Sequence, residues 1–164
     1  MTVAKKWSVP APLTAAHNVT AFESGELTLD YWLKHRALRN EGRGASRTYV
    51  VVCDDHLVIA YYCLSTGSVS SELAPGRIRR NMPEPIPVMV LGRLAVDLAW
   101  QRRSLGKALL RDAILRTIQV SEVVGVKALL VHALSDQAVR FYEANGFYPS
   151  PSNPRTLFLP LSEV

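Results

Sequence analysis

A short basic turn between an apolar strand and a helix is the part of the sequence best suited to chemistry. The turn, residues 101–108, follows the apolar run 88–96 and contains Arg102, Arg103 and Lys107. Backbone N–H groups at a helix N-terminus lack intrahelical partners and lie at the positive end of the helix dipole, so a diphosphate could bind there. An ordinary helix start with solvated arginines fits the same pattern, and the turn by itself leaves both interpretations open.

Length and composition predict one globular domain. The chain has 164 residues, of which 48% are hydrophobic and 20% charged, which is enough for one core. No apolar run approaches the roughly 18 residues that span a bilayer, and residues 1–10 lack the apolar segment of a signal peptide. We therefore expect a single domain over residues 1–164 that acts in the cytoplasm and has no membrane partner.

Charge and cysteine content narrow the possible partners. A net charge of +5 and a pI near 9.5 favour a polyanionic partner. Cys53 and Cys63 lie in neighbouring strand-like runs, without a His or a further Cys at metal-binding spacing. We expect buried free thiols rather than a disulfide or a zinc site, and we expect no metal.

Apolar spacing predicts the elements that come before the turn. A first helix is expected over residues 28–41, with Thr28 as its N-cap and glycines after its end. Strand-like runs flank the hairpin signal Asp54-Asp55-His56 and predict two antiparallel strands, 49–53 and 57–64. Residues 65–87 hold four prolines and predict a long loop, which could include a short helical turn.

The C-terminal half predicts alternating strands and helices. Ser135 is a good N-cap for the second of these helices, and Gly146 stops it. The expected elements are a strand over 88–96, a helix over 105–123, a strand over 128–133, a helix over 136–145 and a strand over 155–161. This order predicts an α/β fold: a central mixed sheet covered by helices on both faces, with a right-handed β-α-β crossover at its centre.

Three motifs in this order resemble the GCN5-related N-acetyltransferases (GNAT family). They are LGRLAVD at 91–97, the turn 101–108, and Ser135-Asp136 followed by FYEANGF at 141–147. The resemblance implies an acetyl-CoA site, with the pantetheine along the strand edge 94–96 and the pyrophosphate on the turn. The cofactor-binding residues that it implies are Leu94, Ala95, Val96, Gln101, Arg102, Arg103, Ser104, Leu105, Gly106, Lys107, Ala108, Ser135 and Phe141.

Further segments extend the resemblance over nearly the whole chain. Residues 27–40, 61–69, 85–93 and 110–117 resemble the acetyltransferase toxins of bacterial type II toxin–antitoxin modules. In that group the substrate is aminoacyl-tRNA, whose α-amine is acetylated so that translation stops. The resemblance therefore implies acetyl-CoA as cofactor, a charged tRNA as substrate, a ribbon-helix-helix antitoxin as partner and a homodimer.

One position departs from the family pattern. The family turn usually reads Gln/Arg-x-x-Gly-x-Gly/Ala, and Ser104 stands where the first glycine is expected. A Cβ at this position costs roughly 1 kcal/mol or more if φ is positive. The serine hydroxyl can, however, donate a hydrogen bond to a phosphate. We expect acetyl-CoA binding to survive the change, while its effect on affinity stays open.

Acetyl transfer to an amine needs a neutral amine, a stabilised oxyanion and a proton for the departing thiolate. By resemblance, Tyr142 places its phenol beside the CoA sulfur as general acid, and a backbone N–H of the strand 94–96 faces the carbonyl oxygen. A ring that merely packs, with its hydroxyl at the surface, is the alternative for Tyr142. No carboxylate stands out as general base, since helix-end or surface solvation explains Asp97 and Glu143 at least as well.

The missing base is informative about the acceptor. A free α-amine has a pKa of about 7.7–8.0, and esterification of its carboxylate lowers the pKa further, whereas a lysine amine titrates near 10.4. An aminoacyl ester is thus substantially neutral at cellular pH and needs no strong base. A base-poor site is therefore more compatible with charged tRNA than with lysine side chains.

Two groups of arginines could hold the phosphates of an acceptor stem. Arg36, Arg39 and Arg43 recur at i, i+3 and i+7 and would share one face of a helix that extends that far. Arg77, Arg79 and Arg80 lie in the predicted loop. A solvated helix face and a loose basic loop are the alternatives. His132 lies in a buried-looking strand, so we expect a core histidine rather than a catalytic one.

The sequence thus predicts a GNAT toxin that acetylates aminoacyl-tRNA. Two other functions compete with it. An acetyltransferase for a small amine or a protein N-terminus would share the fold and the cofactor. A non-catalytic acyl-CoA or RNA-binding module is the second alternative, for which Ser104 is the only hint in the sequence.

Overall fold

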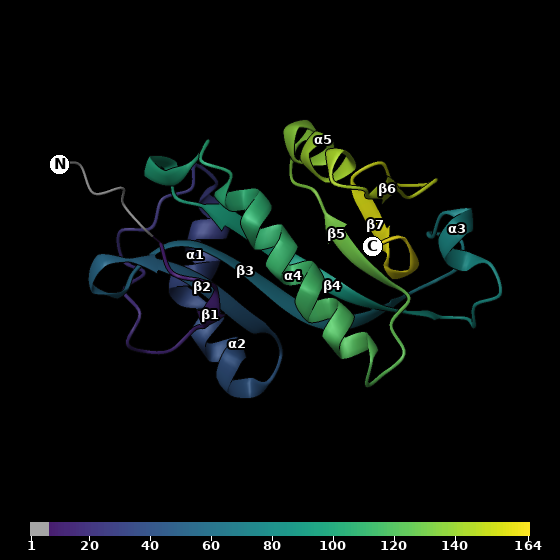
Figure 1. The fold of residues 1–164 in the computed structure, drawn as a ribbon, viewed down its shortest axis with the longest axis horizontal. Coiled ribbons are helices and arrows are strands. Elements are labelled where there is room, and N and C mark those ends of the chain that lie inside the picture. Colours follow the sequence, from purple (N-terminus) through teal and green to yellow (C-terminus); the bar gives the residue numbers. More distant parts are fainter. Residues whose placement is uncertain (1–6) are drawn as a thin grey trace. The chain divides into compact units, whose positions relative to one another are not determined.

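The computed structural model describes residues 7–164, and its strands form a seven-stranded mixed sheet in the order β1-β2-β3-β4-β5-β7-β6 (Figure 1). Residues 1–6 of the expected domain lie outside the described residues. The chain divides into two compact units. The first unit is 1–64 with 93–113, and the second unit is 65–92 with 114–164. A single domain over residues 1–164 stays a prediction.

The two units share β3, β4 and α4, which run through both. The helices are α1 (Leu27–His35), α2 (Ala37–Arg43), α3 (Gly76–Arg79), α4 (Leu105–Ser121) and α5 (Asp136–Ala144). The strands are β1 (Ala11–Pro12), β2 (Arg47–Cys53), β3 (Leu57–Val69), β4 (Ile86–Val96), β5 (Ala128–His132), β6 (Tyr148–Pro149) and β7 (Thr156–Pro160). Short 3-10 turns occupy Asp54–His56, Leu98–Trp100 and Leu161–Glu163.

The first unit is built on the predicted hairpin, which is confirmed. β2 and β3 pair antiparallel on either side of the turn Asp54–His56, with a register shift between Val51 and Val52. Apolar side chains of α1, α2 and the hairpin form one buried cluster. Its members include Trp32, Leu33, Ala37, Val50, Val58 and Tyr61. Burial of these side chains fixes both helices against one face of the hairpin.

The prediction of one helix over 28–41 is wrong. The chain leaves helical geometry at Arg36 (φ −124°), so that α1 ends before it and α2 begins after it. Buried Trp32, Leu33 and Ala37 keep helical spacing across the break, and for that reason spacing alone could not show it.

The N-terminal end of α1 also differs from the prediction. Thr28 lies inside α1 and is not its cap, because the cap position is Glu26, which makes no side-chain cap bond. The buried carboxylate of Asp30 instead accepts hydrogen bonds from the backbone N–H (3.0 Å) and the hydroxyl (2.6 Å) of Ser24. Gly44 ends α2 in the left-handed region (φ 71°), as a glycine C-cap should.

The second unit contains the parallel strand pair that the sequence predicted. β4 pairs parallel with β5, β5 pairs antiparallel with β7, and β6 pairs antiparallel with β7. Ile78, Ile86, Val88, Leu130 and Phe158 lie in its buried core. The predicted loop 65–87 is shorter than expected, since β3 continues to Val69, α3 supplies a helical turn and β4 begins at Ile86.

Three burial and boundary predictions need correction. His132 is exposed rather than in the core, because it ends β5, and its Nδ1 lies 3.0 Å from the Thr156 hydroxyl. Cys53 is half-buried at the end of β2, whereas Cys63 is buried, and both are free cysteines. The two-residue strands β1 and β6 were missed because they are too short to show a periodic pattern.

Candidate functional site

The segment between β4 and α4 has an unusual backbone. Arg102 and Ser104 both adopt φ 63°, in the left-handed region that non-glycine residues rarely enter. Each such residue costs roughly 1 kcal/mol or more and persists only where its surroundings impose the geometry. Left-handed residues next to ordinary ones direct successive backbone N–H groups into a concave nest that suits an anion. The turn therefore has the backbone geometry of an anion site. Ser104, which stands where the family usually has glycine, adopts the positive φ at which a Cβ is costly.

Hydrogen bonds to a distant segment hold the start of this turn, and we call them the clasp. The amide Nε2 of Gln101 donates to the carbonyls of Val96 and Ser24, both at 2.8 Å. The carboxylate of Asp97 accepts from the Glu23 N–H (3.0 Å), and the Leu98 N–H donates to the Glu23 carbonyl (2.8 Å). The clasp joins the residues just before α1 to the residues just before the turn.

The clasp assigns roles to two residues that the sequence left open. Both amide hydrogens of Gln101 are used within the protein, so its side chain positions the turn rather than presenting donors to a ligand. The second carboxylate oxygen of Asp97 accepts from the Ala99 N–H at 3.0 Å. The helix-end interpretation of Asp97 is therefore favoured over a general base. No local pattern indicates the clasp, because the segments that it joins lie more than seventy positions apart in the chain.

The start of α4 presents the remaining cofactor candidates. The Ala108 N–H donates to the Ser104 carbonyl at 3.1 Å, so the N–H groups of the preceding residues are those that a helix start leaves unpaired. Arg102 and Lys107 are exposed, whereas the guanidinium of Arg103 lies 4.9 Å from the Trp100 ring centroid. Leu105 is buried and anchors the helix, and Ala108 is exposed.

The candidate acid lies in α5, in the second unit. The Ser135 hydroxyl accepts the Ala138 N–H at 3.1 Å, which confirms the predicted N-cap. The Tyr142 ring is 8% exposed and packs between the rings of Phe141 and Phe147, each 5.2 Å away between centroids. Burial raises the pKa of the Tyr142 phenol above its ordinary value. Among residues 7–164 no group hydrogen-bonds its hydroxyl, which leaves a neutral donor without a protein partner.

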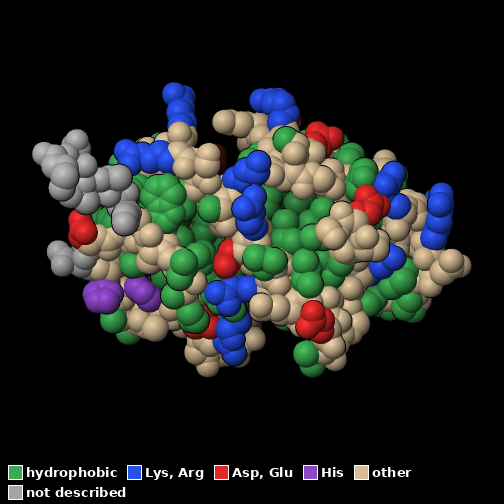
Figure 2. Space-filling model, in the orientation of Figure 1, with side chains coloured by type: hydrophobic (Ala, Val, Ile, Leu, Met, Phe, Trp, Pro, Cys, Tyr) green, Lys and Arg blue, Asp and Glu red, His purple; other side chains and the backbone are tan. Residues whose placement is uncertain are grey.

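The predicted arginine face on the first unit is only partly present. Arg36 lies at the break between α1 and α2, so the prediction that it shares one helix face with Arg39 and Arg43 is wrong. Arg39 and Arg43 lie four positions apart in α2, and all three side chains are exposed. Figure 2 shows Lys and Arg side chains spread over the drawn face rather than gathered in one patch, so charge alone does not outline a binding surface.

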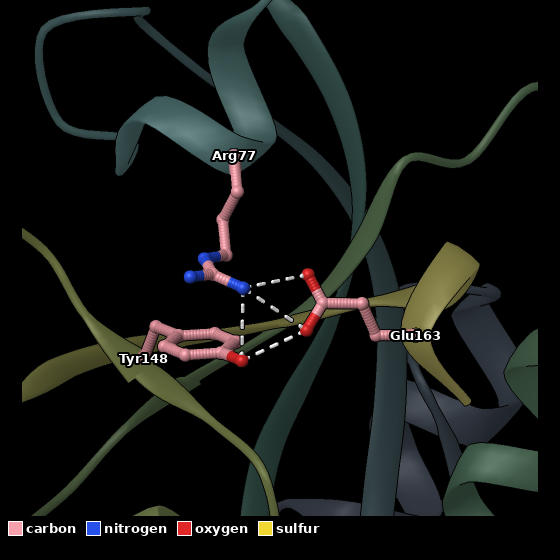
Figure 3. Close-up of polar contacts among 3 residues, drawn as sticks. All are labelled: Arg77, Tyr148 and Glu163. Atoms are coloured by element: carbon pink, nitrogen blue, oxygen red, sulfur yellow. Dashed lines mark hydrogen bonds and ion pairs between the residues drawn. The ribbon is translucent and has the colours of Figure 1, made fainter.

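The second arginine group is divided by an ion pair. Figure 3 shows the Arg77 guanidinium over the Tyr148 ring, 4.0 Å from its centroid, and hydrogen-bonded to the Glu163 carboxylate at 3.0 and 3.2 Å. The Tyr148 hydroxyl donates to the same carboxylate at 2.8 Å. The charge of Arg77 is thus neutralised locally. Arg77 is held by specific contacts and does not belong to a loose basic loop, which was the alternative interpretation. Arg79 and Arg80 are exposed.

The predicted site residues fall into both units. The strand edge 94–96, the turn and Arg36, Arg39 and Arg43 belong to the first unit. The second unit contains Ser135, Phe141 and Tyr142, and it also contains Arg77, Arg79 and Arg80. In residues 7–164 there is no cluster of His, Cys, Asp and Glu that could hold a metal ion. No helix in the same range is long and apolar enough to cross a membrane.

A parallel strand pair, an anion-type turn at the start of the intervening helix and a following FYEANGF helix are the features expected of one acetyltransferase fold. The family model described as "Acetyltransferase (GNAT) domain" matches residues 45–149. The chain belongs to this family of acetyltransferases, and the predicted fold class and enzyme class are confirmed.

Relatives that match nearly the whole chain show which members of the family it is similar to in sequence and in structure. The chain is 48% identical over 158 residues to the tRNA-acetylating toxin of Mycobacterium tuberculosis (strain ATCC 25618 / H37Rv), which covers 96% of this chain and 95% of that protein. It is similar to AtaT complexed with acetyl-methionyl-tRNAfMet, with a TM-score of 0.89, 27% identity and 96% of each chain covered. A tyrosine-to-phenylalanine mutant of AtaT, bound to acetyl-CoA and the C-terminus of the antitoxin AtaR, gives a TM-score of 0.81 at 27% identity over 96% of this chain and 95% of that one.

Proposed function

We propose that this chain is a toxin that transfers the acetyl group of acetyl-CoA to the α-amine of aminoacyl-tRNA and thereby stops translation. The observation that carries the proposal is the 48% identity, over 96% of the chain, to a tRNA-acetylating toxin. The proposal includes a ribbon-helix-helix antitoxin as partner, a homodimer as the assembly and the bacterial cytoplasm as the place of action. The complex of AtaT with the antitoxin AtaR supports an antitoxin as the partner.

The first unit fits the cofactor. Acetyl-CoA supplies an acetyl thioester when bound. The strand edge Leu94–Ala95–Val96 would hold the pantetheine, and the backbone N–H groups from Arg102 to Lys107 would hold the pyrophosphate. Two observations support this assignment: the left-handed residues Arg102 and Ser104, and the exposed basic side chains around the start of α4. Gln101 would act through the clasp, and Ser135 through its cap on the helix that carries Phe141 and Tyr142.

The second unit would supply the proton. The Tyr142 phenol is neutral at physiological pH, since the ordinary tyrosine pKa is about 10 and burial raises the pKa further. Its hydroxyl is free to donate to the departing thiolate, since no group among the described residues hydrogen-bonds it. Asp97 is occupied by backbone N–H groups and Glu143 is exposed, so the α-amine would have to arrive neutral. An aminoacyl ester meets that condition and a lysine side chain does not.

The substrate phosphates would lie on the exposed arginines. These arginines are Arg36, which lies between α1 and α2, Arg39 and Arg43 in α2, Arg79 at the end of α3 and Arg80 just after it; all five are exposed. Arg77 would contribute little unless a phosphate displaced Glu163 from its guanidinium. Charge reversal of Arg79 and Arg80, with Arg77 left in place, should therefore weaken tRNA binding without breaking the ion pair of Arg77 with Glu163.

The direct test is acetylation of purified charged tRNA. Tyr142→Phe should lower kcat by roughly 100- to 10,000-fold, the usual range for a general acid, and leave acetyl-CoA affinity unchanged. Tyr148→Phe, which removes a surface hydroxyl from the same unit, is the matched control and should retain the parent kcat. Reaction of polyamines with no reaction of charged tRNA would establish the small-amine alternative. Tight acetyl-CoA binding without any turnover would establish the binding module.

Growth provides a second test in the cell. Expression of the chain should arrest bacterial growth, and Tyr142→Phe should relieve the arrest. Co-expression of a ribbon-helix-helix protein encoded beside the gene should relieve it as well. Normal growth with abundant, active protein would contradict a toxin.

A further inference from the structure

A hollow beside α1 in the first unit is not used by the site described above. It is an open depression of about 590 Å³, lined by residues 20–23 and by residues of α1 that include Leu27, Tyr31, Lys34 and His35. We call it the α1 hollow. A depression this open leaves much of a ligand in water, and it suits an extended chain that lies on the surface better than a small molecule that must be enclosed.

The exposed side chains of the α1 hollow are of the kind that bases stack on. The side chain of Tyr31 is 55% exposed, and its ring lies 4.5 Å from the His35 ring between centroids, at an angle of 42°. Leu27, one turn earlier on the same helix, is 83% exposed. Aromatic rings at i and i+4 can simply support a helix. Here the pair also borders a cavity, and large apolar groups exposed at a cavity mark a binding surface.

Charge is distributed unevenly along α1. Glu23 and Glu26 precede or begin the helix, whereas Lys34 lies in its last turn, with Arg36 and Arg39 just beyond, and all five side chains are exposed. Asp30, the other acid of the lining, is buried and occupied by the hydrogen bonds from Ser24. The lining of the α1 hollow therefore has Glu23 at one end and Lys34 and His35 at the other, and Arg36 and Arg39 follow beyond its basic end.

The acidic end is joined to the turn by the clasp. The backbone of Glu23 bonds the Asp97 carboxylate and the Leu98 N–H, and the carbonyl of Ser24 accepts from Gln101. A ligand that runs along α1 would thus have one end close to residues that lead into the turn, and its other end among cations. This arrangement suits a strand whose phosphates lie at the basic end and whose tip, which carries no phosphate, lies toward the turn.

We propose that the α1 hollow receives the single-stranded 3′ end of the aminoacyl-tRNA. A base stacks on the Tyr31 ring, Lys34, Arg36 and Arg39 contact the phosphates, and the aminoacyl end is directed toward the clasp and the turn. Stacking on an aromatic ring suits any base, and cations next to the ring track the backbone. The inference rests on the proposed function, because it assumes that charged tRNA is the acceptor.

The test compares Tyr31→Ala with Tyr31→Phe. Base–aromatic stacking is worth about 1–3 kcal/mol, so Tyr31→Ala should raise the KM for charged tRNA roughly 5- to 100-fold, while Tyr31→Phe keeps the parent value. The KM for acetyl-CoA and the thermal midpoint should not move in either variant. Leu38→Ala removes a large exposed side chain of α2 outside the lining and is the matched control. Fluorescence anisotropy with a labelled aminoacyl-minihelix, without acetyl-CoA, should give the same order of affinities.

Lys34→Glu tests the phosphate contacts. It should weaken minihelix binding and reduce the slope of affinity against salt concentration, because fewer counterions are released. If the parent protein acetylates charged tRNA and Tyr31→Ala leaves the KM for charged tRNA unchanged, the α1 hollow does not bind the 3′ end. The proposed function would then stay intact. Parent protein that does not acetylate charged tRNA would overturn both. Loss of antitoxin binding in Tyr31→Ala with no change toward tRNA would identify a protein-docking surface and overturn the proposal.

Discussion

Two substitutions of Ser104 distinguish the backbone strain at this position from recognition of phosphate by its hydroxyl, because they remove different parts of the side chain. Ser104→Ala removes the hydroxyl and keeps the Cβ at φ 63°, whereas Ser104→Gly removes both. A left-handed residue with a Cβ costs about 1–2 kcal/mol, and glycine loses about 0.5–1 kcal/mol to the entropy of the unfolded chain. Glycine should therefore be more stable than alanine here by about 0.5–1 kcal/mol. In a chain of this length that difference raises the thermal midpoint by about 1–4 °C.

The thermal midpoints from scanning calorimetry report the backbone strain. The affinities from titration with acetyl-CoA report whether the hydroxyl contacts the pyrophosphate. A hydrogen bond to a charged group is worth about 1.5–3 kcal/mol, so both variants should bind acetyl-CoA roughly tenfold or more weakly if the hydroxyl contacts the pyrophosphate. Arg102→Gly, at the same φ, should be stabilised as Ser104→Gly is. Equal thermal midpoints for Ser104→Ala and Ser104→Gly would refute the strain argument. Unchanged acetyl-CoA affinity in both would show that the hydroxyl makes no phosphate contact.

The clasp and the ion pair of the second unit give two more predictions. Gln101→Ala removes two hydrogen bonds at an exposed position and should lower the free energy of unfolding by about 1 kcal/mol. It should also raise the KM for acetyl-CoA, because the turn loses its anchor, and an unchanged KM would show that the turn holds its shape without the clasp. Hydrogen bonds from Tyr148 and Arg77 lower the pKa of Glu163, so its contribution to stability is complete above the ordinary glutamate pKa of about 4.3 and is lost as the pH falls through the lower folded value. Unfolding curves of Glu163→Gln and the parent should therefore differ at pH 7 and converge at acidic pH, and a constant difference down to pH about 2 would contradict this linkage.

Local signals explain which parts of the fold could be predicted. The hairpin around Asp54–His56 and the Ser135 cap depend on residues within a few positions of one another, and the structure contains both. The break at Arg36 leaves the apolar spacing of α1 and α2 in phase, so no periodic pattern shows it. Two-residue strands carry no period at all.

The site divides in the same way. The motif located the turn and Tyr142, because those residues are contiguous in the sequence. What the side chains do depends on partners that are far away in the chain: Gln101 bonds Ser24, and Arg77 is neutralised by Glu163. Two residues that looked like ligands for phosphate therefore have other principal contacts. Only three-dimensional structure brings such partners together, since the sequence contains no pairing rule for them.

The hydrogen bonds of the acidic residues bear on whether the site has a general base. A general base must have a lone pair free to take the proton of the amine. In the first unit, Asp97 spends both oxygens on backbone N–H groups and Asp30 is buried beneath Ser24, so each is committed to the segment that positions the turn. Protonation of either carboxylate would weaken the hydrogen bonds that it accepts and would loosen the segment that positions the turn. An acceptor whose amine is already neutral removes that conflict. The structural use of Asp97 and Asp30 thus fits an aminoacyl ester better than a lysine as the acceptor.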